Sequence, residues 1–571
     1  SIAFIGASDD VVKWGGVLLH LLQKFKYEGA IYPINPKASS IQGLPAYRSV
    51  RDIGRPIDLA VITIGVDGVE QAMRECAACG VRAAMVVTAQ FAEAGPEGAA
   101  KQQRVLEVAR KAGIAMIGPN CMGVLNAHQN LALLNSTALL DSFTSIPTGR
   151  IGVVSQSGAV VGAMIARAGH VGAGFSSCVS LGNQADLEIC DFFDYLVDDP
   201  QTGVICLYME SASSVDRLFS IAQRARRAGK PVLITKAGRT PQGARAVASH
   251  TASMAGTYET FAARCRAAGV LLQTDALQML LTAQALLAFA LPPAQGVALF
   301  SGSGGAGALG SDALGEYGLV AAELGAGTRA ALGEFFSESN LPLPYDMGAA
   351  VVGPGKGRAD LMSASIEPIF ADPAVGTCLY IMTPQSSMAE IARLFTELGR
   401  SHGKPAFVVN SASGITEKMR LALIELGAPF FPSLHEAMLT VRDLLWLREV
   451  EQRVPDAAPS SHAQLPAALH DFLRRQPEGM LSEDDAKKML ALAGLDVAAG
   501  ALAPDARSAV QLAQDMGYPV VLKIAADGVT HKSDMGGVAL NLADADAVRA
   551  AFERIERAAS DLPDARFLGC L

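Results

Sequence analysis

The sequence of 571 residues is poor in several residue types, and each scarcity excludes a class of protein. Aromatic residues make up 6% of the chain and charged residues 18%, whereas half of the chain is hydrophobic. This balance excludes a disordered or collagen-like chain and is typical of an α/β protein rich in alanine, glycine and valine. The net charge of −9 argues against a nucleic-acid partner. Nine scattered cysteines, an odd number, are too few for a disulfide scaffold and suit a reducing cytoplasm.

Neither a signal peptide nor a convincing membrane span is visible in the sequence. Residues 276–291 carry no charge, but they contain Gln278, Thr282 and Gln284 and fall short of the roughly 20 apolar residues that a span needs. We interpret them as a buried helix that leads into a linker, and we expect no membrane partner. The chain opens directly on a predicted strand without a methionine and stops at what looks like the start of another, so we expect it to be part of a longer polypeptide.

Alternating strands and helices organise the first part of the chain. Continuous apolar strands with crossover helices between them predict a parallel sheet covered on both faces. The strands are expected at residues 2–5, 30–34, 59–64, 83–87 and 115–117, and the helices from residue 14 and at 69–79 and 97–112. A loop-rich stretch is expected at residues 126–150.

An internal repeat follows. A strand, a Ser-x-Ser-Gly turn and a helix of small residues occur at 151–158 and again at 297–304. Further strands are expected at 203–209 and 232–236 in the first copy, and at 375–381 and 406–410 in the second. We interpret the two copies as flavodoxin-like domains. Residues 454–464 have a linker's composition, and a helix at 482–493 and a strand at 519–524 lie beyond them.

The turn Gly6-Ala7-Ser8 after the first strand occupies the place of a dinucleotide fingerprint, although G-x-G-x-x-G is absent. Asn35-Pro36-Lys37 stands where an NAD-binding protein usually has an acidic residue. A lysine there favours a phosphorylated ribose or nucleotide over NAD. The alternative is a tight turn without a ligand.

The two Ser-x-Ser-Gly turns place backbone N–H groups and hydroxyls at helix N-termini, which hold anions through unpaired donors and the helix dipole. One such turn can serve as a simple N-cap. Two related copies in one chain indicate an anion gripped from both sides. The residues concerned are Ser155, Ser157, Gly158, Ser303 and Gly304.

Three further side chains are candidates for chemistry. His250 lies among small and hydroxyl residues on a predicted loop, and a neutral imidazole can attack phosphorus, although a lone histidine is more often a surface or core residue. Glu210, at the end of a strand, could orient that imidazole or be a solvated acid. Lys523 faces a Gly-rich turn that suits nucleotide phosphates. Cys121 and the pair Cys76 and Cys79 lack the partners that a nucleophile or a zinc site needs.

Taken in order, these motifs resemble the ADP-forming (NDP-forming) acyl-CoA synthetases, relatives of succinyl-CoA synthetase. The motifs are Ile5-Gly6-Ala7-Ser8, Pro33-x-Asn35-Pro36-Lys37, Gly118-Pro119-Asn120-Cys121, Ser155-Gln156-Ser157-Gly158, Ser249-His250-Thr251, Val521-Leu522-Lys523 and Lys532-Ser533-Asp534-x-Gly536-Gly537. The resemblance implies an α/β multidomain protein. Its domains would be a CoA-binding Rossmann-like domain (1–126), a ligase domain with a phosphohistidine loop (148–291), a second flavodoxin-like ligase domain (295–450) and the N-terminal part of an ATP-grasp domain (465–571).

The same resemblance implies roles for individual residues. His250 would be the phosphorylated histidine, Glu210 its support, and Lys523 an ATP contact. The helix N-termini after Ser157 and Ser303 would cradle the phosphohistidine. The CoA contacts would be Gly6, Ala7, Ser8 and Lys37, with Val87, Thr88 and Ala89 lining the same cleft.

The implied reaction joins a carboxylic acid to CoA with ATP and Mg²⁺, and releases ADP and phosphate through a phosphohistidine and an acyl phosphate. Metal ligands are not assigned, and the acid is not readable, although Gly162 leaves room for a bulky one. Homo-oligomers are expected from the resemblance. Ala252 and Leu343-Pro344-Tyr345 depart from the family pattern. The alternatives are part of a protein lysine acetyltransferase, a lyase coupled to CoA ligation, and a CoA- or nucleotide-binding sensor.

Overall fold

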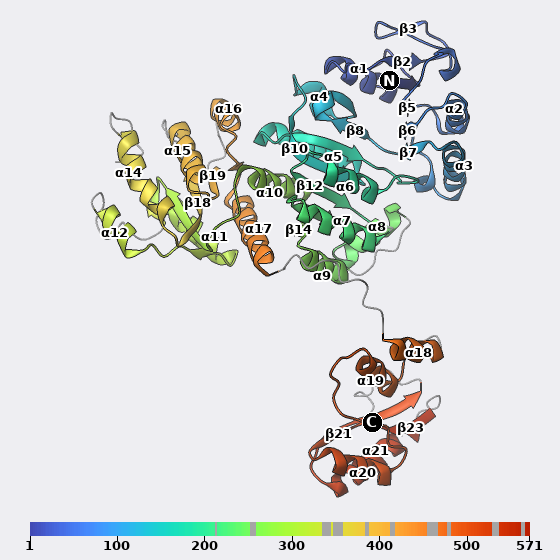
Figure 1. The fold of residues 1–571 in the computed structure, drawn as a ribbon, viewed down its shortest axis with the longest axis vertical. Helices are drawn as coiled ribbons and strands as arrows, with labels where there is room; N and C mark the ends of the chain where they lie inside the picture. Colours follow the sequence, from blue (N-terminus) through green and yellow to red (C-terminus); the bar gives the residue numbers. More distant parts are fainter. Residues whose placement is uncertain are drawn as a thin grey trace. The chain divides into compact units, whose positions relative to one another are not determined.

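The computed structural model describes eleven ranges of the chain, which form two compact units, Ser1–Asp456 and Ala457–Leu571 (Figure 1). The ranges are 1–211, 214–251, 258–333, 344–346, 358–382, 388–410, 417–453, 466–476, 481–527, 536–560 and 566–571. The predicted linker at 454–464 lies outside them. Within these ranges, every helix is too short or too polar to cross a bilayer.

The first sheet is parallel and has the strand order β2-β1-β5-β6-β7. Its strands are β1 (Ile2–Ile5), β2 (Ile31–Ile34), β5 (Leu59–Ile62), β6 (Ala83–Val86) and β7 (Ala115–Ile117). The paired helices α2 (Val66–Ala78) and α3 (Pro96–Ala112) cover one face, and α1 (Trp14–Lys24) packs between the sheet and the next domain (Figure 1). The predicted doubly wound fold is confirmed.

The second sheet has the order β14-β13-β12-β10-β11-β8-β9. Its parallel strands are β10 (Thr148–Ser155), β11 (Phe175–Ser180), β12 (Val204–Met209), β13 (Val232–Lys236) and β14 (Leu271–Gln273). The stretch predicted to be loop-rich is partly wrong, because β8 (Gly123–Asn126) and β9 (Leu131–Leu134) form an antiparallel hairpin on the edge of this sheet, followed by α4 (Thr137–Asp141). The apolar run of β9 is buried against α1, which explains why it folds as a strand.

Helices cover both faces of the second sheet. Helices α5 (Gly158–Val171) and α10 (Ala276–Ala288) pack against each other on one side, and α6 (Ile189–Asp198) and α7 (Val215–Arg227) pair on the other. Two further helices, α8 (Pro241–Thr251) and α9 (Tyr258–Ala268), complete this domain.

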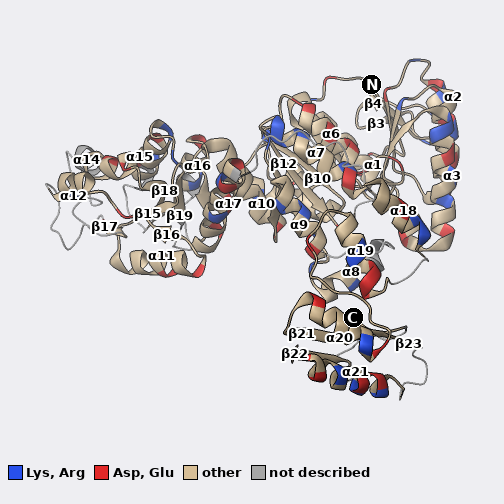
Figure 2. Ribbon diagram, turned by 60° about the horizontal axis from the view of Figure 1, so that its bottom comes forward, with Lys and Arg blue, Asp and Glu red and all other residues tan. Residues whose placement is uncertain are grey.

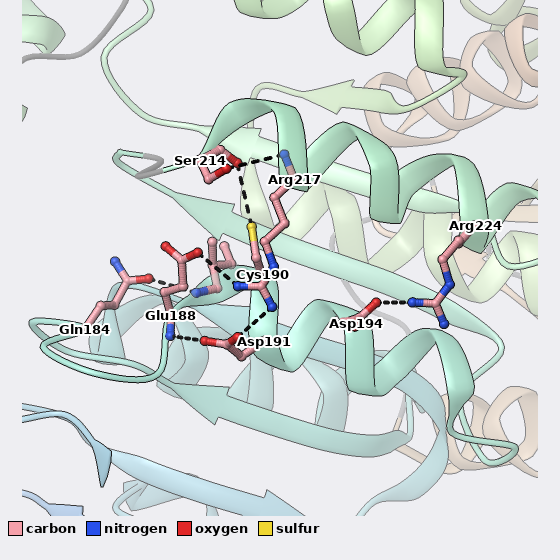
Figure 3. A network of polar contacts seen from close by, with 9 residues as sticks. Gln184, Glu188, Cys190, Asp191, Asp194, Ser214, Arg217 and Arg224 are labelled. Atoms are coloured by element: carbon pink, nitrogen blue, oxygen red, sulfur yellow. Dashed lines mark hydrogen bonds and ion pairs between the residues drawn. The ribbon is translucent and has the colours of Figure 1, made fainter. Parts of the chain in front are cut away.

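Ion pairs fix α6 against α7 (Figure 3). Arg217 reaches Asp191 at 2.6 Å and Glu188 at 3.3 Å, and Arg224 bridges Asp194 and Asp198. These pairs are half-exposed, so each contributes about 1 kcal/mol or less. They set the position of the helix pair over the strands whose ends form the site described below.

The third sheet repeats the second. Its order β16-β15-β18-β19-β20 is 2-1-3-4-5 in sequence, the same as for β11-β10-β12-β13-β14, and this is the flavodoxin-like order. The strands are β15 (Gly296–Ser301), β16 (Val320–Ala321), β18 (Val375–Met382), β19 (Ala406–Asn410) and β20 (Phe430–Phe431), with β17 (Tyr345–Asp346) beside β15. The helices are α11 (Gly304–Glu316), α12 (Ala326–Gly333), α14 (Arg358–Ala371), α15 (Met388–Ser401), α16 (Glu417–Glu425) and α17 (Leu434–Arg453).

The second unit is built on β21 (Val520–Asp527), which pairs antiparallel with β22 (Val538–Leu542) and β23 (Arg566–Cys570). Its helices are α18 (Ala467–Arg475), α19 (Glu483–Leu492), α20 (Ala506–Met516) and α21 (Ala545–Ser560). Charged side chains gather on outer helices such as α2, α3 and α21, while the strands are mostly uncharged (Figure 2). The α/β multidomain class predicted from the sequence is confirmed.

Candidate active site

The turn after β1 is a close-packed backbone cradle at the N-terminus of α1. Gly6 has φ +94°, a conformation that favours glycine. A Cβ at Gly15, in the first turn of α1, would lie 1.9 Å from the carbonyl oxygen of Gly6. The helix has no side-chain cap, so its first N–H groups stay available to a ligand. This arrangement fits the phosphate groups of a nucleotide such as the one in CoA.

The end of β2 is tied to that turn. Asn35 donates from Nδ2 to the carbonyl oxygen of Ala7 at 3.0 Å and accepts at Oδ1 from the N–H of Lys37 at 2.9 Å. Ala7 is buried, whereas Lys37 is exposed at the same edge of the sheet. The hydroxyl of Ser8 accepts from the N–H of Asp10 and shapes the loop. The structure therefore brings together the four residues predicted at the mouth of the cleft.

A cavity of about 770 Å³ opens between the carboxyl edge of the first sheet and α5 of the second domain. Val87, Thr88 and Ala89, predicted to line the cleft, lie on its wall, and Gly162 lies on the opposite wall. The remaining lining residues are Trp14, Thr63, Ile64, Gly65, Asn120, Cys121, Met122, Asn135, Ser136, Thr137, Ala159, Ala163 and Ala166. Burial raises the pKa of Cys121 to about 12, so its thiol lines the cavity and does not act as a nucleophile.

The first Ser-x-Ser-Gly turn joins β10 to α5. The Ser155 hydroxyl is fully buried, donates to the carbonyl oxygen of Ser157 at 2.7 Å and accepts from the Ser157 N–H at 3.1 Å. The Ser155 hydroxyl therefore stabilises the turn through the Ser157 backbone and is not exposed to an anion. Ser157 is the N-cap of α5 without a side-chain cap bond, so the helix N-terminus stays open. A Cβ at Gly158 would lie 2.3 Å from Cγ of Met122, which explains the glycine.

The second turn reproduces the first. The Ser301 hydroxyl donates to the carbonyl oxygen of Ser303 at 3.0 Å and accepts from its N–H at 3.1 Å. Ser303 occupies the N-cap position of α11, and its side chain again makes no capping hydrogen bond. Gly304 begins the helix, and a Cβ built there would lie 3.4 Å from a carboxylate oxygen of Asp346. Asp346 follows Tyr345, one of the residues that differ from the family pattern. The sequence analysis did not single out Ser301, although its register with Ser155 in the repeat would have revealed it.

Glu210 lies where β12 ends, next to the first turn. The Gln156 side chain accepts from the N–H groups of Glu210 and Ser211 at 2.5 and 3.0 Å and donates to the Ser211 carbonyl oxygen at 2.7 Å. Lys236, at the end of β13, donates from Nζ to the Glu210 carbonyl oxygen at 2.6 Å, and burial lowers its pKa. Strand order puts all three at the switch point where ligands bind such sheets. The roles of Gln156 and Lys236 were not predicted from the sequence.

His250 lies in α8, and its side chain is outside the description. The sequence analysis placed it on a loop, but residues 241–251 are helical in backbone. This correction has a physical reason, because the alanine-rich stretch after Pro241 has good helix propensity and a proline at its first position. α8 follows β13, the strand that ends at Lys236.

In the second unit, Lys523 lies in the middle of β21, and its Nζ donates to Oε1 of Glu483 at 2.8 Å. Glu483 begins α19. A lysine on a strand with an acid partner can exchange that partner for a phosphate oxygen. Of the Gly-rich turn predicted beside it, residues 531–535 lie outside the description, and Gly536 and Gly537 lead into β22.

The fold and these sites are typical of proteins that bind nucleotides and other anions at helix N-termini along the carboxyl edges of doubly wound sheets. Comparisons with known proteins agree. Residues 1–127 match a CoA binding domain, 148–286 a succinyl-CoA ligase-like flavodoxin domain and 473–571 an ATP-grasp domain.

Relatives cover nearly the whole chain. ADP-forming acetate–CoA ligase I of Archaeoglobus fulgidus is 32% identical over all of this chain and 81% of its own. A trans-feruloyl-CoA synthase from an unidentified prokaryote is 32% identical over 97% of this chain and 78% of its own. Acetyl-CoA synthetase 1 of Candidatus Korarchaeum cryptofilum, solved with phosphate and ADP, has a TM-score of 0.69 at 27% identity over 79% of this chain and 96% of its own.

The chain belongs to the ADP-forming acid–CoA ligases. Members of this family are ligases that use CoA and ATP and form ADP, so the activity class and the two nucleotide substrates predicted from the sequence are confirmed.

Proposed function

We propose that this ligase works through a phosphohistidine at His250 and an acyl phosphate. The observation that carries the proposal is the pair of identical Ser-x-Ser-Gly turns, each of which ends at a helix N-terminus without a side-chain cap. Two such termini supply unpaired N–H donors and the positive ends of two helix dipoles to one anion. A phosphoryl group in transfer needs this electrostatic support more than it needs covalent help.

The reaction has three balanced steps. A ring nitrogen of His250 attacks the γ-phosphorus of ATP, and ADP leaves. The carboxylate of the acid attacks the phosphohistidine, which restores the histidine and gives an acyl phosphate. The CoA thiolate attacks the acyl carbon, and phosphate leaves. Glu210, whose backbone is fixed by Gln156 and Lys236, is proposed to accept the second ring N–H of His250 and orient the imidazole.

The other predicted residues would hold the substrates. The cradle at Gly6, Ala7 and Ser8 with Lys37 would bind the phosphates of CoA, and Lys523 would bind those of ATP. Mg²⁺ accompanies ATP in an ATP-grasp domain and neutralises phosphate charge. The described residues contain no cluster of three potential metal ligands, so the magnesium ligands stay unassigned.

We further propose a cytoplasmic homo-oligomer. All nine cysteines are free thiols and eight of them are buried, a state that a reducing compartment maintains. Some relatives are divided into separate subunits, such as the α subunit of acetate–CoA ligase II of Pyrococcus furiosus, so association between domains of this type is compatible with the fold.

The test is phosphorylation of the full-length protein by γ-labelled ATP and Mg²⁺. We expect an acid-labile, base-stable label that a carboxylic acid and CoA discharge together, and no label on His250→Ala. Glu210→Gln should slow labelling by roughly 10²-fold or more, as loss of an orienting acid does. If protein that binds ATP takes no label, the relay is wrong, and the sensor or acyltransferase alternatives take its place.

A further inference from the structure

One wall of the 770 Å³ cavity is a single face of α5. Ala159, Gly162, Ala163 and Ala166 line the cavity, and their spacing of three and four residues puts them on one side of the helix. From the first to the last, this face runs roughly 10 Å at 1.5 Å per residue. It begins two residues after Ser157, in the first turn of α5, where the proposed relay delivers the phosphoryl group.

Gly162 opens onto unfilled space. A Cβ built there meets no atom within 4 Å, whereas one at Gly158 would collide with Met122. Packing therefore requires glycine at position 158 but not at position 162. A glycine inside a helix is less favourable than alanine. Glycine at position 162 therefore leaves open volume on this wall at a cost in helix stability.

Ser136 adds a polar group to the same cavity. Its side chain lines the cavity although the residue is only 4% exposed, and it is the N-cap of α4 without a cap bond. Within the described part of the chain, its hydroxyl has no hydrogen-bond partner. The hydroxyl lies on the cavity wall, so a ligand oxygen in the cavity can form a hydrogen bond with it.

We propose that this cavity is the acyl pocket for an acid several carbons longer than acetate, with an oxygen substituent that hydrogen-bonds to Ser136 and with Gly162 setting the size limit. The inference rests on the proposed relay, which puts the reacting carboxylate at the N-terminus of α5. CoA approaches from the wall formed by Thr63, Ile64 and Gly65. The volume along α5 then belongs to the body of the acid.

The test measures kcat/KM of the full-length enzyme for acetate, butyrate, 4-hydroxybutyrate, phenylacetate and 4-hydroxyphenylacetate. We expect wild type to prefer the larger hydroxylated acids to acetate by tenfold or more. Gly162→Leu should lower the ratio of the larger acids to acetate at least tenfold, and Gly162→Ala should lower it less, in proportion to side-chain size. Ser136→Ala should remove most of the preference for each hydroxylated acid over its parent, roughly tenfold.

Labelling of the same preparations by γ-labelled ATP separates the two proposals, because phosphorylation requires no acid. Label on His250 together with a preference for acetate that Gly162→Leu does not change would overturn the pocket assignment alone. Absence of label would overturn the relay. A rise in the KM for CoA that is equal for every acid in Ser136→Ala would put the hydroxyl against CoA and contradict its role in acid recognition.

Discussion

The two Ser-x-Ser-Gly turns have the same internal hydrogen bonds but differ in their hydrogen bonds to the neighbouring strand. Both fold through the same pair of serine hydrogen bonds. In the first turn, Gln156 reaches across to the end of β12 and fixes Glu210 and Ser211, whereas Gly302 at the same place in the second turn has no side chain to do so. The repeat thus supplies two equivalent helix N-termini, and the side chain of the first turn is bonded to the backbone of an acidic residue, Glu210. We infer that the first copy carries the chemistry and the second adds charge stabilisation.

The strongest test of this comparison places a negative charge at each N-cap. Ser157→Asp and Ser303→Asp keep a good N-cap, so the helices remain stable. A carboxylate beside the phosphoryl site repels the anion, and we expect each variant to lose on the order of 10²–10³-fold in kcat. Steady-state rates and thermal unfolding would be measured together.

Ser157→Asn and Ser303→Asn are the matched neutral controls, since asparagine caps helices as well as aspartate does. Equal losses in the two aspartate variants, spared in the asparagine variants, would mean that both termini hold one anion. Full activity in Ser303→Asp would exclude the second turn from the site.

The second prediction concerns the difference between the turns. Gln156→Ala leaves the part-buried N–H groups of Glu210 and Ser211 without the Gln156 acceptor, which costs about 1 kcal/mol of stability. Displacement of Glu210 should lower kcat by roughly 10²-fold, because small misplacements at a reacting centre are expensive. Urea unfolding and the rate of histidine phosphorylation would measure both effects.

Gly302→Ala is the corresponding change in the second turn, and φ at Gly302 is not in the left-handed region. We expect it to alter kcat by less than about threefold, because glycine at that position has no side chain that could bridge to the neighbouring strand. Comparable losses in the two variants would mean that the cross-strand bridge is not what distinguishes the copies.

The repeat itself could be predicted from the sequence, because each strand is a continuous apolar run and each turn has the same four-residue pattern. β1 and β13 were predicted with the bounds that the structure has. The bridge could not be predicted, since Gln156 and Glu210 are 54 residues apart and meet only because β12 lies next to β10. Lys236 was missed for the same reason. Its place at the end of β13 gives no sign that Nζ turns back to the Glu210 carbonyl.

The two copies are also joined by a buried polar seam between α17 and the segment formed by the end of β14 and α10, and Asp443 is its titratable member. Gln273 donates to Asp443 at 2.6 Å, and Gln278 donates to Thr440 at 2.9 Å. Burial raises the pKa of Asp443 from 3.8 to about 6, despite the hydrogen bond from Gln273 and the nearby Arg442. The protonated form therefore favours folding. Its contribution is complete below about pH 4 and is lost as the pH rises through 6.

Asp443→Asn removes this titration and keeps an acceptor for Gln273. At pH 8 the variant should be more stable than wild type by about 1–3 kcal/mol, and the difference should vanish near pH 4. Urea unfolding of both proteins from pH 4 to 8 would measure it, and a difference that does not change with pH would mean that Asp443 does not titrate in this range. If Asp443→Asn leaves kcat unchanged, the ionisation of Asp443 affects stability alone. A change in kcat would link the seam between the two copies to turnover.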